Sequence, residues 1–191
     1  MKNTGKLAFL LAIAVSFAVT TFAQGPQMEK NALKGVRAET MSQLVAAEKK
    51  FIALAEATPQ DKYGWRPGEG VRSVSEVFMH VAAANYGVLS AAGVKPEGVT
   101  MEEIRGFEKI TDKAKVVEVL KASFEHARKG INGVSDDDLD NSVKLFGSDS
   151  TVRGVLIAVA VHCHEHLGQS IAYARTTGIV PPWSVRSGGG Q

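Results

Sequence analysis

The sequence predicts an all-α protein, an antiparallel four-helix bundle with a short extra helix between its second and third long helices. Four long segments place apolar residues at helical steps, and stretches rich in glycine and proline separate them. We find no internal repeat and no reliable strand pattern. The 191 residues suit one domain with enough chain to bury a sizeable core.

The first long helix is expected over residues 28–57. It ends before Pro59, because the residue that precedes a proline is disfavoured in helical geometry. The connection over residues 60–72 is rich in turn formers, yet it also carries Tyr63 and Trp65. Aromatic side chains in a turn either cover the core or form a pocket wall, and we expect a lid packed over the core.

The second long helix is expected over residues 74–92, before Gly93. Ser73 and Glu76 form a capping box at its start, in which each side chain accepts a hydrogen bond from the other residue's backbone. On this helix His80 lies on the apolar, inward side. Taken alone, such a histidine is interpreted as a core residue with one satisfied hydrogen bond.

A short helix capped by Thr100 is expected to end near Phe107. The third long helix is expected over residues 112–131, with Thr111 as its cap. His126 lies off the apolar stripe of this helix, next to charged neighbours. We therefore expect His126 to be solvated and to bind no metal.

The last part of the chain contains the fourth long helix. Before it, the aspartates of residues 135–140 lack the ligand spacing and the glycine of an EF-hand loop, so we interpret them as a solvated turn. Residues 143–147 are expected to be briefly extended. The fourth helix is expected to begin at Ser150 or Thr151 and to end near Thr177, before a glycine and two prolines.

The N-terminal segment indicates export. Its first residues carry two lysines and no acid, residues 7–19 are apolar apart from one serine, and a small-x-small cleavage pattern follows. These features predict a signal peptide over residues 1–23 and a secreted or periplasmic location. The alternative, an uncleaved membrane anchor, needs a longer apolar span, so we expect no stable anchor. The folded domain is then expected over residues 24–183, with a disordered tail over 184–191.

The charge balance and the cysteine content limit the kinds of binding partner and of covalent cross-link that this chain can have. Cleavage would remove Lys2 and Lys6 and leave 20 basic and 20 acidic residues, so nothing in the balance favours nucleic acid, and we expect no nucleic-acid partner. Cys163 is the only cysteine, which excludes an internal disulfide. We do not expect Cys163 to act as a ligand or as a nucleophile.

Three of the five histidines lie within residues 161–169 of the fourth helix. Side chains four positions apart lie on the same helix face, about 6 Å from each other. His162 and His166 can therefore approach one ion, whereas His164 points away, toward solvent or a partner subunit. A stable metal site requires at least one more ligand from elsewhere in the chain.

His80 is the best candidate for that third ligand. Three neutral imidazoles suit zinc or nickel, with iron as a further option, and leave coordination positions open. Gln169 and Tyr173 continue the histidine stripe and are candidates to support the ligands from behind. Glu76 is a further candidate, although its capping role already explains it. The alternative is a buried, hydrogen-bonded histidine network without metal.

This arrangement resembles the DinB (DinB/YfiT-like) superfamily of metal-dependent four-helix bundle proteins. The resemblance extends over about residues 28–183, and it depends on the helix layout together with three short motifs. The matching residues are Tyr63-Gly64-Trp65-Arg66-Pro67, then Val71-Arg72-Ser73 leading to Phe78-Met79-His80-Val81, and His162 and His166 with Leu167-Gly168-Gln169. The resemblance implies a DinB-type bundle, a three-histidine metal site, a long crossover between the second and third long helices, and a homodimer.

Characterised relatives in that superfamily include thiol S-transferases and a maleylpyruvate isomerase. This chain differs from the common pattern in Leu167, where an arginine often follows the last ligand, and in the additional His164. Its secretion signal would also remove it from the cytoplasmic thiol pool, which argues against a thiol transferase.

We therefore expect an exported protein that binds one divalent metal through His80, His162 and His166. It would act on a small-molecule substrate as a metal-dependent hydrolase or thiol transferase. Two alternatives remain. One is a non-catalytic metal-binding or stress-associated bundle in which the ion is structural, and the other is a helical interaction domain without metal.

Overall fold

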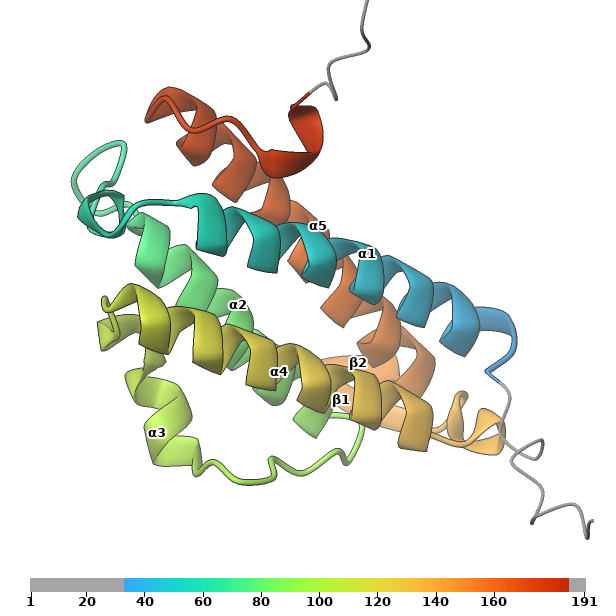
Figure 1. The fold of residues 1–191 in the computed structure, drawn as a ribbon. Coiled ribbons are helices and arrows are strands. Elements are labelled where there is room, and N and C mark those ends of the chain that lie inside the picture. Colours follow the sequence, from blue (N-terminus) through green and yellow to red (C-terminus); the bar gives the residue numbers. More distant parts are fainter. Residues whose placement is uncertain (1–32, 186–191) are drawn as a thin grey trace, which may run out of the picture. The chain divides into compact units, whose positions relative to one another are not determined.

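The computed structural model describes residues 33–185, which form a helical bundle with a small β-ribbon (Figure 1). Four long helices build the bundle: α1 (Gly35–Ala57), α2 (Val74–Ser90), α4 (Lys113–Gly133) and α5 (Val152–Thr176). The short helix α3 (Met101–Gly106) and a 3₁₀ turn (Phe107–Lys109) lie between α2 and α4, as predicted. The expected all-α bundle with an extra helix in the crossover is thus confirmed.

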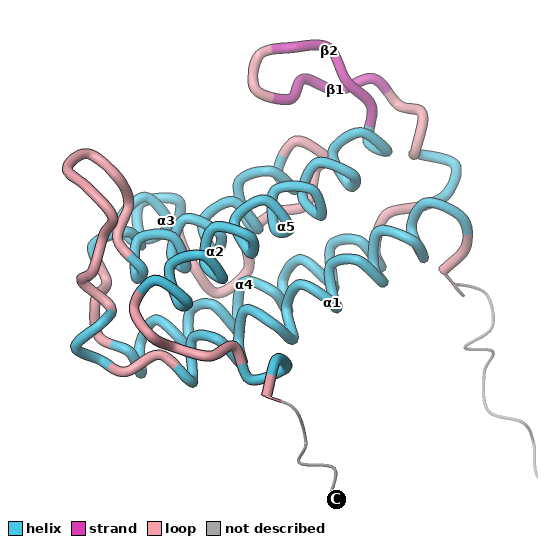
Figure 2. The backbone as a smooth tube through the Cα atoms, turned by 90° about the horizontal axis from the view of Figure 1, so that it is seen from above, coloured by secondary structure: helices cyan, strands magenta, loops and turns pink. Residues whose placement is uncertain are grey.

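The strands β1 (Ser142–Leu145) and β2 (Ser148–Thr151) connect α4 to α5 and form an antiparallel hairpin. Figure 2 shows this hairpin at one end of the bundle. Phe146 and Gly147, its two loop residues, both have positive φ (52° and 84°), the conformation that two-residue hairpin turns favour. The sequence had indicated only a brief extended segment, because β1 alternates polar and apolar residues over only four positions and β2 consists of polar residues alone.

Each long helix packs against two others: α1 and α2 both contact α4 and α5. The pairs α1 and α2, and α4 and α5, therefore lie diagonally across the bundle, whereas α2 and α4 are neighbours. The colours of Figure 1 show that α1 and α5 run in one direction and that α2 and α4 run in the other. The chain must consequently cross the length of the bundle between α2 and α4, and α5 lies antiparallel to α2.

The core lies between the four long helices. Phe51 of α1 is fully buried and contacts Phe78 of α2 and Phe124 of α4, with ring centroids 6.2 and 5.9 Å apart. Burial of a large apolar side chain contributes about 1.5–3 kcal/mol relative to exposure. Tyr63 is also fully buried and donates a hydrogen bond to the carbonyl of Ala55 (2.8 Å). The connection between α1 and α2 is therefore a packed lid, as predicted.

The capping motifs in the sequence predicted the helix starts correctly, with two exceptions. The capping boxes at Ser73 and Thr100 are present, and Thr151 caps α5. However, α4 is capped by Asp112 and not by Thr111. The expected start of the first helix was wrong for the residues that the structure describes, because α1 begins only at Gly35. The backbone before it is extended, and Gly35 itself has φ +50°, which interrupts a helix.

Some predictions concern residues outside the described part of the chain. These are the signal peptide over 1–23, the first residues of the predicted first helix, and most of the tail over 184–191. Within residues 33–185, no helix combines the length and the apolar character needed to cross a bilayer.

Candidate metal centre

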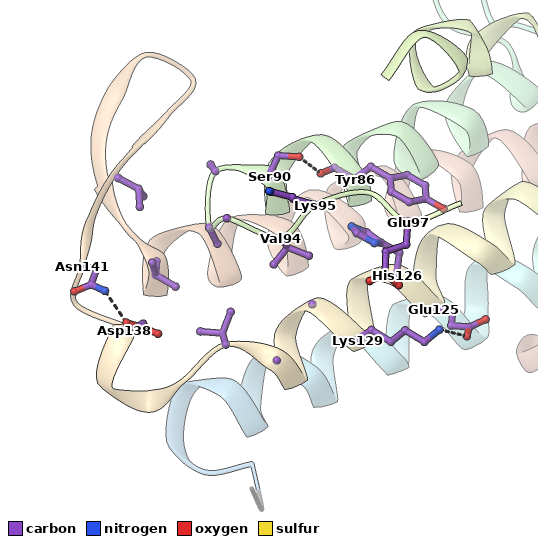
Figure 3. A pocket seen from close by; sticks show the side chains of 18 of the residues that line it. Tyr86, Ser90, Val94, Lys95, Glu97, Glu125, His126, Lys129, Asp138 and Asn141 are labelled. Carbon is purple, nitrogen blue, oxygen red and sulfur yellow. Dashed lines mark hydrogen bonds and ion pairs between the residues drawn. The ribbon is translucent and has the colours of Figure 1, made fainter. Parts of the chain in front are cut away.

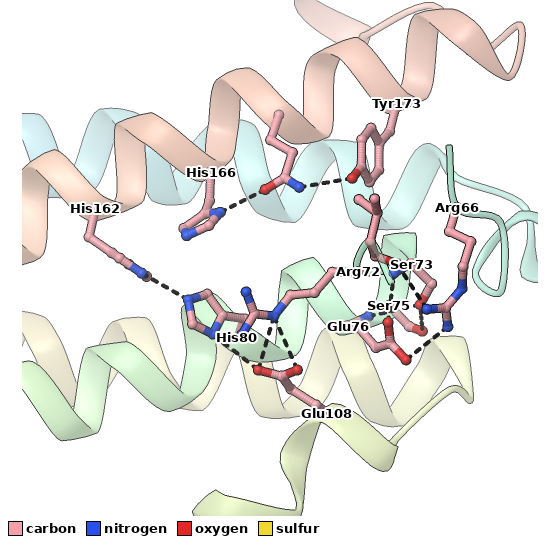
Figure 4. A network of polar contacts seen from close by, with 12 residues as sticks. Arg66, Arg72, Ser73, Ser75, Glu76, His80, Glu108, His162, His166 and Tyr173 are labelled. Carbon is pink, nitrogen blue, oxygen red and sulfur yellow. Dashed lines mark hydrogen bonds and ion pairs between the residues drawn. The ribbon is translucent and has the colours of Figure 1, made fainter. Parts of the chain in front are cut away.

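The three histidines singled out in the sequence meet between α2 and α5 (Figure 4). Nε2 of His162 lies 3.2 Å from Nε2 of His80. One ring nitrogen from each of His80, His162 and His166 lies within 4.8 Å of the corresponding atoms of the other two. Each ring is partly buried. The structure therefore brings the predicted ligand set to one point.

Two antiparallel helices produce this meeting. His162 and His166 lie one turn apart on α5 and face α2, while His80 lies in the second turn of α2. The start of α2 is held by the capping box at Ser73 and by backbone hydrogen bonds to the lid, from Ser75 to Tyr63 and from Val74 to Trp65. The position of His80 is thus set by a helix that is anchored at its first turn.

Glu108, which the sequence had not indicated, orients His80. Its Oε1 lies 3.0 Å from Nδ1 of His80, and Arg72 donates from Nε to both carboxylate oxygens, at 3.2 and 3.1 Å. A carboxylate at Nδ1 stabilises the tautomer that carries the proton there, which leaves a lone pair on Nε2. Glu108 is 28 residues from His80 and belongs to the crossover, so no spacing rule could have identified it.

His166 is oriented in the same way by Gln169. Nδ1 of His166 lies 2.8 Å from Oε1 of Gln169, and the amide nitrogen of Gln169 donates to the hydroxyl of Tyr173 at 2.8 Å. The ring of Tyr173 packs against Trp65 of the lid, with centroids 5.3 Å apart. Gln169 and Tyr173 thus lie behind His166, in the places where they were expected.

Glu76 does not take the supporting position that was considered for it. Its carboxylate accepts a hydrogen bond from the backbone of Ser73 (2.7 Å) and pairs with Arg66 (3.0 Å). The hydrogen bond from Ser73 is the main reason that the pKa of Glu76 is lowered. Both interactions direct the carboxylate away from the histidines, and the acid that reaches His80 is Glu108.

Burial keeps two of the imidazoles neutral. Burial, followed by the charges of His166, His80 and Arg72, lowers the pKa of His162 to about 4. The pKa of His80 is lowered mainly by burial and secondly by Arg72, while Glu108 opposes the shift. Neutral imidazole is the form that binds metal, so at neutral pH these two rings need lose no proton before they coordinate an ion.

Two neighbours on α5 do not belong to the cluster. His164 is exposed and lies 3.2 Å, through Nε2, from the carbonyl oxygen of Gln43. Cys163 is buried, its thiol donates to Oδ1 of Asn85 (3.4 Å), and burial raises its pKa to about 12. Its burial and its raised pKa disfavour metal binding and nucleophilic attack by this thiol.

The prediction that His126 is solvated was wrong. His126 is only 8% exposed and stacks on Tyr86, with ring centroids 4.4 Å apart. Tyr86 of α2 and the crossover segment that contains Glu97 cover this face of α4 (Figure 3), an arrangement that helical periodicity does not reveal. These residues line an open pocket of about 990 Å³, and none of the three clustered histidines lines it.

The fold and the site together define a class of protein: a helical bundle with a long crossover and a three-histidine cluster able to hold a metal ion between antiparallel helices. The sequence model of the DinB superfamily matches residues 43–170, about two thirds of the chain. The chain belongs to the DinB superfamily, which confirms the resemblance seen in the sequence. A comparison with curated proteins found no match.

Several solved structures share the fold. A DinB-like protein from Bacillus cereus has a TM-score of 0.63 at 18% identity, covering 76% of this chain and 95% of its own. A DinB-like protein from Bacillus subtilis has a TM-score of 0.58 at 22% identity, covering 74% and 93%. A conserved protein from Enterococcus faecalis has a TM-score of 0.62 at 14% identity, covering 75% and 97%. Identities this low demonstrate a common fold and nothing about the reaction.

Proposed function

We propose that this protein binds one divalent metal ion through His80, His162 and His166 and uses it as a metal-dependent hydrolase or transferase of a small-molecule substrate. The proposal depends on one observation: hydrogen bonds at Nδ1 turn the Nε2 atoms of two of these imidazoles into acceptors that share one site. Glu108 does this for His80 and Gln169 for His166. Only His162 then has an N–H that it could direct toward the other two.

A hydrogen-bonded network without metal satisfies this arrangement poorly. The N–H of His162 at Nε2 can pair with only one of the two acceptors, so the other lone pair has no partner within the cluster. The buried Nδ1 of His162 also has no hydrogen-bond partner within residues 33–185. One cation accepts all three lone pairs. The 3.2 Å between the Nε2 atoms of His80 and His162 is also close to the separation of about 3.3 Å that follows from tetrahedral zinc with bonds of 2.0–2.1 Å.

The donor set suits zinc or nickel, with iron as a further option, and three protein ligands leave coordination positions open for a substrate. When bound, such an ion supplies Lewis acidity toward a substrate oxygen and lowers the pKa of a bound water or thiol. The residues of the chain orient the imidazoles: Glu108 contacts His80, and Gln169, which bonds to Tyr173, contacts His166.

Export supports the hydrolase over the thiol transferase. The signal-peptide pattern of residues 1–23 favours a secreted or periplasmic protein. Such a location separates the protein from the low-molecular-weight thiols of the cytoplasm. We include in the proposal a folded domain over residues 24–183 after cleavage, and a homodimer, which the family resemblance implies.

The metal content of purified protein tests the proposal. Wild type, reconstituted with zinc or nickel and freed of excess ion, should hold about one equivalent by elemental analysis. His162→Ala should lose most of it. His164→Ala, two residues away on the exposed side of the same helix, should retain it. Wild type without bound metal, or an equal loss in both variants, would exclude the site.

Partial burial of all three histidines between two helices favours a second candidate, in which the ion only links α2 to α5. A structural ion contributes folding free energy directly, so its removal should lower the melting temperature strongly. In the catalytic case the metal-free bundle should remain folded, and a screen of ester, amide and thiol substrates should reveal turnover that the chelator abolishes.

A further inference from the structure

Arg72 lies at the histidine cluster with part of its guanidinium unengaged. Its Nε donates to both carboxylate oxygens of Glu108, and within residues 33–185 no hydrogen bond involves its two terminal amino groups. The side chain is 42% exposed. Figure 4 shows the guanidinium beside the imidazole of His80, on the side of the cluster where Glu108 lies.

A second arginine of the same connection provides a contrast. Arg66 is equally exposed, at 42%, and also pairs with a glutamate. However, both of its amino groups bond to the chain: Nη1 donates to the carbonyl of Val71 (2.9 Å) and Nη2 donates to Glu76 (3.0 Å). Arg66 therefore completes the structure of the lid, whereas Arg72 retains donors that nothing in the described chain uses.

The charges around Arg72 favour an anion. Glu108 is the only carboxylate that pairs with Arg72 within residues 33–185, and the imidazole of His80 on the other side of Glu108 brings no negative charge. A divalent ion at the three histidines would make the local charge strongly positive. The two amino groups of a guanidinium form a planar fork that matches the two oxygens of a carboxylate or phosphate.

We propose that Arg72 and the histidine-bound ion together form an oxyanion-binding site, so that the substrate carries a carboxylate or a phosphate group. The inference rests on the proposed function, since the ion is one of the two anchors. Arg72 would bind the anionic group directly, and its Nε contact with Glu108 would hold the fork in place. Within the proposed function, the substrate class becomes small anionic molecules, so the esters, amides or thiols that turn over should be those that carry a carboxylate or a phosphate group.

Anion titrations of the metal-loaded protein test this. Wild type, Arg72→Met and Arg66→Met are loaded with cobalt(II), their metal content is measured, and acetate and inorganic phosphate are titrated while the visible cobalt spectrum is followed. Wild type should bind at least one of the two anions. Arg72→Met should weaken that binding tenfold or more, and Arg66→Met should change it less than twofold. The anion that binds more tightly distinguishes a carboxylate from a phosphate substrate.

Measuring the metal affinity of the variants distinguishes a role of Arg72 in anion binding from a purely structural role. Removing a positive charge from the neighbourhood of an ion should leave cobalt affinity unchanged or increase it in Arg72→Met. If Arg72 only holds Glu108 and His80 in position, Arg72→Met should instead weaken metal and anion binding together, which would overturn the inference. Arg72→Lys, which keeps the charge but lacks the fork, should recover part of the anion affinity.

The failure of this inference differs from the failure of the proposed function. Wild type that holds no metal overturns the proposed function and this inference with it. Wild type that holds one ion, yet binds neither anion or binds it as tightly in Arg72→Met as in Arg66→Met, overturns the oxyanion site alone.

Discussion

At the scale of single residues, the histidine cluster depends on groups that bind no metal themselves. His80 receives its orientation from Glu108 and His166 from Gln169, each through a hydrogen bond at Nδ1. Such a bond fixes both the ring and its tautomer, so the loss of one partner lowers metal affinity even though all three ligands remain. Glu108 is the more sensitive of the two because its charge also holds Arg72.

We expect Glu108→Ala to weaken metal binding about 10–100-fold, the range typical for loss of such a partner. Glu108→Gln should have a smaller effect, since its amide oxygen can still accept a hydrogen bond from the N–H at Nδ1. Glu102→Ala removes an exposed acid from the nearby helix α3 and serves as the control. Competition with a chromogenic chelator measures the affinities. Similar losses for Glu108→Ala and Glu102→Ala would mean that only general charge matters.

At the scale of elements, the start of α2 connects the lid to the site. Ser73 accepts the backbone hydrogen bond of Glu76 and is itself buried, so the first turn of α2 is held immediately before the turn that carries His80. The corresponding box at Thr100 begins the short helix α3 and is exposed. The same capping motif should therefore contribute more to stability at Ser73 than at Thr100, because only the cap at Ser73 is packed on the core.

Ser73→Ala should lower the free energy of unfolding by about 1–2 kcal/mol, the upper part of the range for loss of an N-cap. Thr100→Ala should lower it by less, about 0.5 kcal/mol, since an exposed helix end can be solvated by water. Urea denaturation followed by circular dichroism measures both. An equal or greater loss for Thr100→Ala would contradict the view that the buried cap at Ser73 contributes more to stability than the exposed cap at Thr100.

At the scale of the whole molecule, the buried histidines link stability to pH. Burial lowers the pKa of His162 to about 4 and also lowers those of His80 and His126. The unfolded chain then takes up protons near pH 6.5, whereas the folded chain takes them up only at lower pH. Stability of the metal-free protein is therefore greatest above pH 6.5 and is lost as the pH falls through that value toward the folded-state pKa.

Between pH 7 and pH 5, His162 alone should account for a loss of about 2 kcal/mol. The pKa of Glu76 is lowered from 4.5, so its contribution to stability is lost mainly below pH 4.5. It therefore affects the difference between pH 7 and pH 5 little. Urea unfolding of metal-free wild type and His162→Gln at the two pH values checks this, with His164→Gln as the exposed control. A pH dependence that is unchanged in His162→Gln would contradict the assignment.

The sequence by itself determined the helices, most of their caps and the three histidines of the cluster. Each of these depends on spacing along one helix or on residues within one turn, and such information is local. His162 and His166 share a face because they are four residues apart, and the capping box at Ser73 needs only Glu76, three residues later. His80 was added because it lies on the inward side of another helix.

Only the tertiary structure decided which groups surround those histidines. Glu108 and Arg72 reach His80 from segments that the crossover and the lid bring together. His126 is buried because Tyr86 covers it, although its own helix would leave it in solvent. These contacts join residues far apart in the chain, and neither helical periodicity nor motif spacing carries information about them, since they arise only when the helices pack.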